Sequence, residues 1–184
     1  MNADRKFHGF AGPAAGFEAP LEMLAACHGR IQAQFATLRR LALHLAAHGA
    51  DAQARSAAAA VMRYFDSAAL DHHADEESDL FPALLEAMAG SDAVCIRDLT
   101  TCLVAEHREL EAAWAQLRMV LAEIAAGLTS RLDDEQLLAF TGLYEAHLAL
   151  EEGELLPMAE RLLDDAQLDA IGRAMRERRG VGEV

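Results

Sequence analysis

Apolar residues recur every three or four positions over four long stretches of the chain, which is the spacing of an amphipathic α-helix. Gly49 ends the first stretch, and Gly90 and Ser91 mark a turn after the second. Four long helices with short connections favour an antiparallel up-down bundle. The predicted helices cover about Pro20 to His48, Ala52 to Met88, Ala93 to Ala126 and, after an N-cap at Asp133 or Asp134, Leu137 to Met158.

The N-terminal residues differ from this helical body. Residues 1–19 mix glycine and proline with aromatic residues, so we expect a loop arm. We expect its rings to pack against the body of the protein and His8 to be solvated. The aromatic residues of the arm are Phe7, Phe10 and Phe17.

The composition agrees with an all-α fold. Hydrophobic residues make up 53% of the chain, carried mainly by Ala and Leu, and there are only four prolines. A length of 184 residues is natural for one domain. We therefore predict a four-helix bundle domain over residues 20–179, which includes a short C-terminal helix over residues 165–179, and a tail over residues 180–184.

Polar residues interrupt the apolar stripe of every predicted helix. A lone histidine interrupts the first and third stripes, and a histidine with a glutamate four residues on interrupts the second and fourth. Positions four apart lie on one helix face, one turn apart. A proline follows each paired histidine by ten residues, at Pro82 and Pro157, so the layout occurs twice. The candidate residues are His28, His72, Glu76, His107, His147 and Glu151.

These six residues have two interpretations. A single histidine on an apolar stripe is more often a core residue with a hydrogen-bond partner, and a single helix glutamate is usually solvated. In a bundle of two helical hairpins, however, all four histidines can meet at one depth with the two carboxylates opposite each other. Six such groups would be buried without partners unless they bound a metal. Imidazole and carboxylate donors without thiolate suit iron or manganese.

The second helix also requires a choice between two neighbouring histidines. The proline spacing matches His72 and Glu76 to the second motif, which leaves His73 and Glu77 rotated away from the core. Tyr144 precedes His147 by about one turn. It is either a core residue or a hydrogen-bond donor to the ligands, and we favour the core role. We expect the remaining acidic residues to be ordinary surface groups, including Asp75, Glu77, Glu109 and Glu152.

Charge and cysteine content exclude several classes of function. A net charge of −14 and a pI near 4.9 argue against binding to nucleic acid or to an anionic membrane surface. No apolar run approaches the roughly 20 residues needed to span a bilayer, and no signal peptide is evident, so we expect a cytoplasmic protein. Three cysteines without a Cys-x-x-Cys motif predict small buried thiols rather than disulfides: Cys27, Cys95 and Cys102.

The histidine and glutamate pattern resembles that of hemerythrin-like domains with the His-His-Glu cation-binding signature. The Leu80-Phe81-Pro82 and Leu155-Leu156-Pro157 sequences and the arginine-rich segment 172–180 are similar to that family too. The resemblance implies that the four histidines divide between two iron ions, with manganese as an alternative metal, and that Glu76 and Glu151 bridge them.

The same resemblance implies a non-haem di-iron protein that binds or reacts with a small oxidant such as O2, peroxide or NO. The alternative function is a metal-binding module that senses or stores iron without redox catalysis. Oxygen-carrying hemerythrins have five histidines and an aspartate in the last motif. This chain has four in the pattern and two glutamates, so we expect stable oxidation rather than reversible O2 carriage. The sequence indicates no particular protein partner.

The register of the second helix gives a first testable prediction. We expect the His72→Ala variant to lose bound metal and the His73→Ala variant to keep it, because only His72 matches the repeated motif. Elemental analysis of both purified variants after dialysis measures the metal content per chain. The reverse outcome would mean that the helix presents its other histidine to the site.

Overall fold

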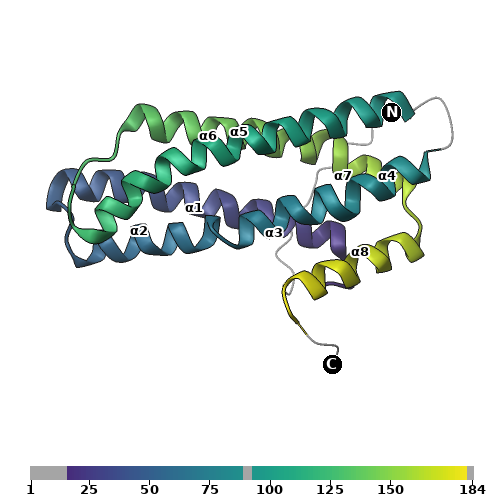
Figure 1. Cartoon of the computed structure of the whole chain (residues 1–184), viewed down its shortest axis with the longest axis horizontal. Coiled ribbons are helices and arrows are strands. Elements are labelled where there is room, and N and C mark those ends of the chain that lie inside the picture. Colours follow the sequence, from purple (N-terminus) through teal and green to yellow (C-terminus); the bar gives the residue numbers. More distant parts are fainter. Residues whose placement is uncertain (1–15, 89–92, 182–184) are drawn as a thin grey trace, which may run out of the picture.

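The computed structural model describes residues 16–88 and 93–181, and all their regular elements are helical (Figure 1). Four rods lie side by side, so the predicted helical bundle is confirmed. The first and third rods are the unbroken helices α1 (Pro20–His48) and α5 (Ala93–Ala126). The second rod contains α2 (Ala52–Phe65), α3 (Ala68–Asp75), η1 (Glu76–Leu80) and α4 (Phe81–Ala87). The fourth contains α6 (Asp134–Leu150), η2 (Glu151–Leu155) and α7 (Leu156–Leu162), and α8 (Asp165–Arg178) follows it.

Glycine and polar residues end and start the helices, and two of them, Gly49 and Asp133, do so as the sequence predicts. Gly49 has a φ of 69°, a left-handed conformation that glycine adopts without steric cost, and α1 ends there. The Asp51 carboxylate then accepts a hydrogen bond from the Ala54 amide and caps α2. Asp133 caps α6 through the amide of Glu135, and Asp164 begins α8 with a reciprocal capping box.

The second rod is broken where the sequence predicted one long helix. α2 ends at Phe65, and the chain turns through Asp66 and Ser67 before α3 begins. The Asp66 carboxylate accepts hydrogen bonds from the Trp114 indole and the Arg118 guanidinium on α5. Apolar spacing continues across the break, so the sequence did not signal it, and the partners on α5 are distant in the chain.

A wide turn precedes each of the two prolines. In η1 the Phe81 amide donates to the carbonyl of Glu76, and in η2 the Leu156 amide donates to that of Glu151. These hydrogen bonds join residues five positions apart, which is the pattern of a π-helix. The wider turn accommodates the next residue, a proline, which has no amide hydrogen. Both wide turns begin at the glutamate of a His-x-x-x-Glu pair, so this irregularity lies at the candidate site.

The apolar core consists of two clusters along the bundle. One cluster contains Phe35, Phe65 and Phe140, and the other contains Leu24 and Leu103. On α1 and α5 the candidate histidines lie between residues of the two clusters. The bundle therefore contains a polar layer that apolar side chains close on both sides.

Helix α8 packs against α1 and α3, outside the four rods (Figure 1). Asp75, which we expected at the surface, is fully buried beneath it. Its carboxylate accepts hydrogen bonds from Arg178 and from Arg179, whose Nη2 lies 2.6 Å from Oδ2 of Asp75. The surface prediction for Asp75 is wrong because its two cationic partners are far away in the sequence.

The end of the N-terminal arm also lies on α8. The Arg176 guanidinium carbon lies 5.3 Å from the centre of the Phe17 ring, a distance typical of cation–π contacts. The Phe17 carbonyl oxygen approaches Gly172 so closely that a Cβ there would lie 2.0 Å from it, so only glycine fits. Phe7, His8 and Phe10 fall outside the described residues.

The cysteines agree only in part with the prediction. Cys27 is buried, whereas Cys95 and Cys102 are exposed on α5, and all three are free thiols. In the described parts of the chain, we find no helix with the length and hydropathy required to cross a bilayer.

The Asp75 contacts predict a strong dependence of stability on α8. Replacing both Arg178 and Arg179 with Met leaves a buried carboxylate without a cation, and we expect a loss of roughly 3 kcal/mol in the free energy of unfolding. Urea denaturation of metal-free protein measures it. Arg173→Met, at an exposed position on the same helix, is the matched control. Equal stability of the two variants would contradict the importance of this ion pair.

Candidate metal centre

The six residues singled out from the sequence meet inside the polar layer. They come from all four rods, and each is at most 1% exposed. Each of the predicted pairs, His72 with Glu76 and His147 with Glu151, lies on its own rod, and α1 and α5 add one histidine each. The side chains brought together are His28, His72, Glu76, His107, His147 and Glu151.

Glu151 faces two pairs of histidines with its two oxygens. Its Oε2 lies 3.2 Å from Nε2 of His28 and 3.9 Å from Nε2 of His72. Its Oε1 lies 2.9 Å from Nε2 of His147 and 3.9 Å from Nε2 of His107. One carboxylate therefore spans two halves of the cluster, which we call the His28–His72 half and the His107–His147 half.

Glu76 spans the same two halves. Its Oε1 lies 3.6 Å from Nε2 of His72, and its Oε2 lies 3.3 Å from Nε2 of His107. Each half thus contains two imidazoles and one oxygen from each carboxylate. In each half, one donor atom from each of the four residues lies within 4.8 Å of the other three.

The inward-facing atoms of this cluster have no hydrogen-bond partner. This holds for Nε2 of all four histidines and for all four oxygens of Glu76 and Glu151. A buried polar atom without a partner costs about 1–3 kcal/mol, and a charged one costs more. A bound cation satisfies nitrogen lone pairs and carboxylate oxygens at once. The residues present therefore fit a metal site.

The protonation states also suit metal binding. Burial lowers the pKa of His72 to about 3, although the Glu151 charge opposes this, so its imidazole is neutral. Burial would raise the pKa of Glu151, but the imidazoles of His107, His147 and His28 hold it well below its usual range. Burial and the Glu151 charge raise the pKa of Glu76 well above its usual range. The metal-free pair therefore carries one negative charge, and a cation would displace the remaining proton.

Three further carboxylates orient three of the imidazoles from outside. The Nδ1–H groups of His107, His147 and His28 donate to Glu77 at 2.7 Å, Glu106 at 2.8 Å and Glu152 at 3.0 Å, respectively. With the proton on Nδ1, the lone pair of Nε2 is directed into the centre. Such outer carboxylates are typical of histidine-ligated metal sites.

This arrangement corrects part of the sequence interpretation. The prediction that Glu77 and Glu152 are ordinary surface groups is wrong, and Glu106 was not recognised at all. Glu109 is exposed, as expected. The repeated signal was available, because each glutamate of the two His-x-x-x-Glu pairs is followed at once by a second glutamate, in Glu76-Glu77 and in Glu151-Glu152. Glu106 directly precedes His107, yet it contacts a different histidine, which the sequence does not indicate.

Comparison with known proteins agrees with this donor set. A family model described as the hemerythrin HHE cation binding domain matches residues 19–159. The chain belongs to the hemerythrin HHE cation-binding family. A Haemophilus influenzae protein described as uncharacterized is 31% identical over 169 residues, covering 92% of this chain and 95% of the relative. Membership of this family supports metal binding. The description of the Haemophilus influenzae relative does not indicate an activity.

The hemerythrin-like centre contains one histidine that we expected elsewhere. His73 is only 5% exposed, so the prediction that it points away from the core is wrong. Its ring stacks on His107 with centroids 4.0 Å apart and planes 10° from parallel. Burial lowers its pKa to about 2, so it is neutral. One nitrogen each of His73, His107 and His147 lie within 4.8 Å of one another, so His73 is close to the His107–His147 half. The retention of metal by His73→Ala stays our prediction.

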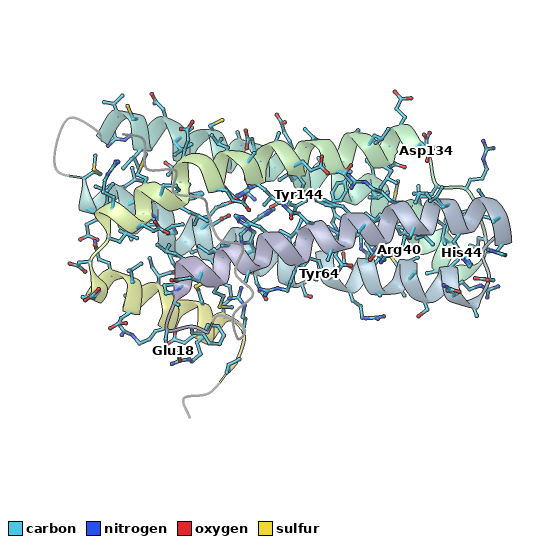
Figure 2. All side chains as sticks on the ribbon, turned by 180° about the vertical axis from the view of Figure 1, so that it is seen from behind. Glu18, Arg40, His44, Tyr64, Asp134 and Tyr144 are labelled. Atoms are coloured by element: carbon cyan, nitrogen blue, oxygen red, sulfur yellow. The ribbon has the colours of Figure 1, made fainter. Side chains whose placement is uncertain are left out.

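Tyr144 is a core residue, as we favoured, and its hydroxyl contacts a histidine outside the six candidate residues. Its ring packs among Phe35, Phe65 and Phe140, and Figure 2 shows it inside the bundle between α6 and α1. Its hydroxyl lies 3.3 Å from Nε2 of His73. Burial raises the pKa of this phenol, which therefore stays protonated as a hydrogen-bond donor.

Metal removal should destabilise the folded protein. Metal binds the native state preferentially and partners the buried atoms, so we expect the loaded protein to melt at a clearly higher temperature than the metal-free protein. Glu151→Ala should abolish this difference, because it removes an oxygen from each half. Differential scanning calorimetry with and without metal measures the effect, and His44→Ala, which alters a surface histidine bonded to Asp51, is the control. Equal melting of metal-free and loaded wild-type protein would contradict a buried metal centre.

Proposed function

We propose that this hemerythrin-like protein holds two iron ions and binds or reacts with a small oxidant such as O2, peroxide or NO. His28 and His72 would hold one ion, His107 and His147 the other, and both glutamates would bridge them. The observation that carries this proposal is that Glu76 and Glu151 each present one oxygen to each half. Manganese, which accepts the same nitrogen and oxygen donors, is the alternative metal.

Bound iron would supply the one-electron chemistry that these side chains lack. The chain itself supplies neutral imidazoles, two bridging carboxylates and an apolar surrounding that excludes bulk water. Carboxylate charge beside a metal favours its higher oxidation state. The donor set therefore supports oxidation to a stable ferric form rather than reversible carriage of O2.

The surroundings of the centre favour small uncharged molecules. Five apolar residues that lie one or two turns from the candidate histidines along their helices are all buried: Leu24, Ile31, Leu103, Leu110 and Phe140. A cavity of about 10 Å³ lies beside His73 and Tyr144, with Phe65, Ala69 and Trp114 among its other lining residues. This volume is close to the minimum that holds one water-sized molecule. A larger anion does not fit in this space.

A second candidate function is metal sensing or storage without redox catalysis. It is favoured by the position of Asp75, which directly precedes Glu76 in the chain and is held by Arg178 and Arg179 of α8. Metal binding at Glu76 could change how α8 is held, and a partner could detect this helix. Reactivity with oxidants separates the two functions, because a sensor or store needs none.

The test is to load the metal-free protein anaerobically with ferrous iron and then expose it to O2. We expect two irons per chain and conversion to a ferric absorption spectrum that does not reverse when O2 is stripped under argon. Return of the ferrous spectrum over repeated cycles would indicate an oxygen carrier. Two bound irons that are inert to O2, peroxide and NO would favour the sensing or storage function.

A further inference from the structure

We propose that the two halves of the centre bind metal with unequal affinity and that the His107–His147 half fills first. This inference rests on the proposed two-metal function. It follows from a difference between the halves in the groups that hold the imidazoles in place. The two halves share the same two carboxylates and each contains two of the candidate imidazoles. The difference lies in the groups around these imidazoles, including His73, which lies close to His107 and His147.

In the His107–His147 half, both imidazoles are fixed at Nδ1. Glu77 and Glu106 accept these hydrogen bonds, and their side chains are only 22% and 33% exposed. Arg108 also donates to Glu77 and holds that carboxylate in place. Both rings therefore present an oriented Nε2 lone pair before any metal arrives.

In the His28–His72 half, only one imidazole has such a partner. Glu152 accepts from Nδ1 of His28, but its side chain is 50% exposed, so solvent competes for it. His72 is fully buried, and neither of its nitrogens has a hydrogen-bond partner. Nothing there fixes which nitrogen of His72 carries the proton, so binding must first select the tautomer and orientation.

The internal repeat of the chain locates the difference at one position. His28 and His107 are the lone histidines of the two hairpins, and the residues directly before them are Cys27 and Glu106. Glu106 holds the paired histidine of its hairpin, His147. The corresponding residue, Cys27, is a buried thiol that contacts Arg30 instead. The missing carboxylate at this position leaves His72 without a partner.

His73 adds to the same difference. It stacks on His107 and lies 3.3 Å from the Tyr144 hydroxyl, so the ring of His107 is supported on its face as well as at Nδ1. The position that corresponds to His73 in the second motif is Leu148. The well-ordered imidazoles therefore lie on the His107–His147 side, and such preorganisation favours binding.

The result that tests this inference is which half fills first. The mere observation of two separate binding steps does not test it. Two cations held close together repel each other, so even a symmetric centre would bind the second metal more weakly. Loss of an outer partner typically lowers metal affinity about 10- to 100-fold. We therefore expect the first metal to depend on Glu106 and His147 and the second to depend on His72.

The experiment is an anaerobic titration of the full-length metal-free protein with cobalt(II), whose visible spectrum reports each step. Glu106→Cys places at position 106 the residue type found at the corresponding position 27, and it should weaken the first step about 10-fold or more. Glu106→Gln is the matched control, because its amide oxygen still accepts the Nδ1 hydrogen bond and should restore most of the affinity. In addition, His147→Ala should weaken the first step, and His72→Ala should weaken the second.

Several results would overturn the inference. If Glu106→Cys leaves the first step as tight as in the wild type, or if His72→Ala weakens that step as much as His147→Ala does, the halves do not fill in this order. Glu106 is partly exposed, so its variants test the order even if a histidine variant fails to fold, which circular dichroism would reveal. Wild-type protein that binds fewer than two cobalt ions would refute the two-metal proposal itself, and the stoichiometry distinguishes this failure from a wrong order.

Discussion

Two buried carboxylates that face four imidazoles, without a hydrogen bond among their inward atoms, are the constraint on which the structure depends. Moving an ionised carboxylate from water into a protein interior costs several kcal/mol, and only a close counter-charge with good geometry offsets it. Glu76 and Glu151 are both fully buried, and three of the imidazoles opposite them are already held from outside by Glu77, Glu106 and Glu152. The polar layer is therefore held from outside at three of its four imidazoles and unsatisfied inside, an arrangement that a cation in the centre would resolve.

The wide turns η1 and η2 explain how two consecutive glutamates can serve one histidine. Glu76 faces Nε2 of His107 from within the centre, and Glu77 accepts from Nδ1 of the same ring. Glu151 and Glu152 contact His28 in the same way. Each lone histidine is thus held at Nδ1 and faced at Nε2 by carboxylates of the opposite hairpin. These contacts between the glutamates of one hairpin and the lone histidine of the other connect the two hairpins at the level where the apolar core is interrupted.

The sequence predicted the features that depend on which face of a helix a residue occupies. The apolar stripes located the rods and the two lone histidines, His28 and His107, and the repeated His-x-x-x-Glu and proline spacing identified the other four inward residues. It did not predict features that depend on contacts between distant segments. The break at Asp66 is held from α5, and the burial of Asp75 depends on arginines of α8. His73 was misplaced because we assumed that only one of two adjacent residues can face the interior, whereas the bundle surrounds α3 on more than one side.

The same contacts between the two hairpins also determine how a bound metal would affect the stability of the fold. The polar layer divides the apolar core into two clusters, so the packing of each cluster alone does not connect the hairpins at that level. Glu76 comes from the first hairpin and faces His107 of the second, and Glu151 comes from the second and faces His28 of the first. A cation in either half would therefore link both hairpins. Metal affinity and the stability of the bundle thus depend on the same contacts, and variation in the outer residues at positions 27 and 106 alters one half without removing a ligand.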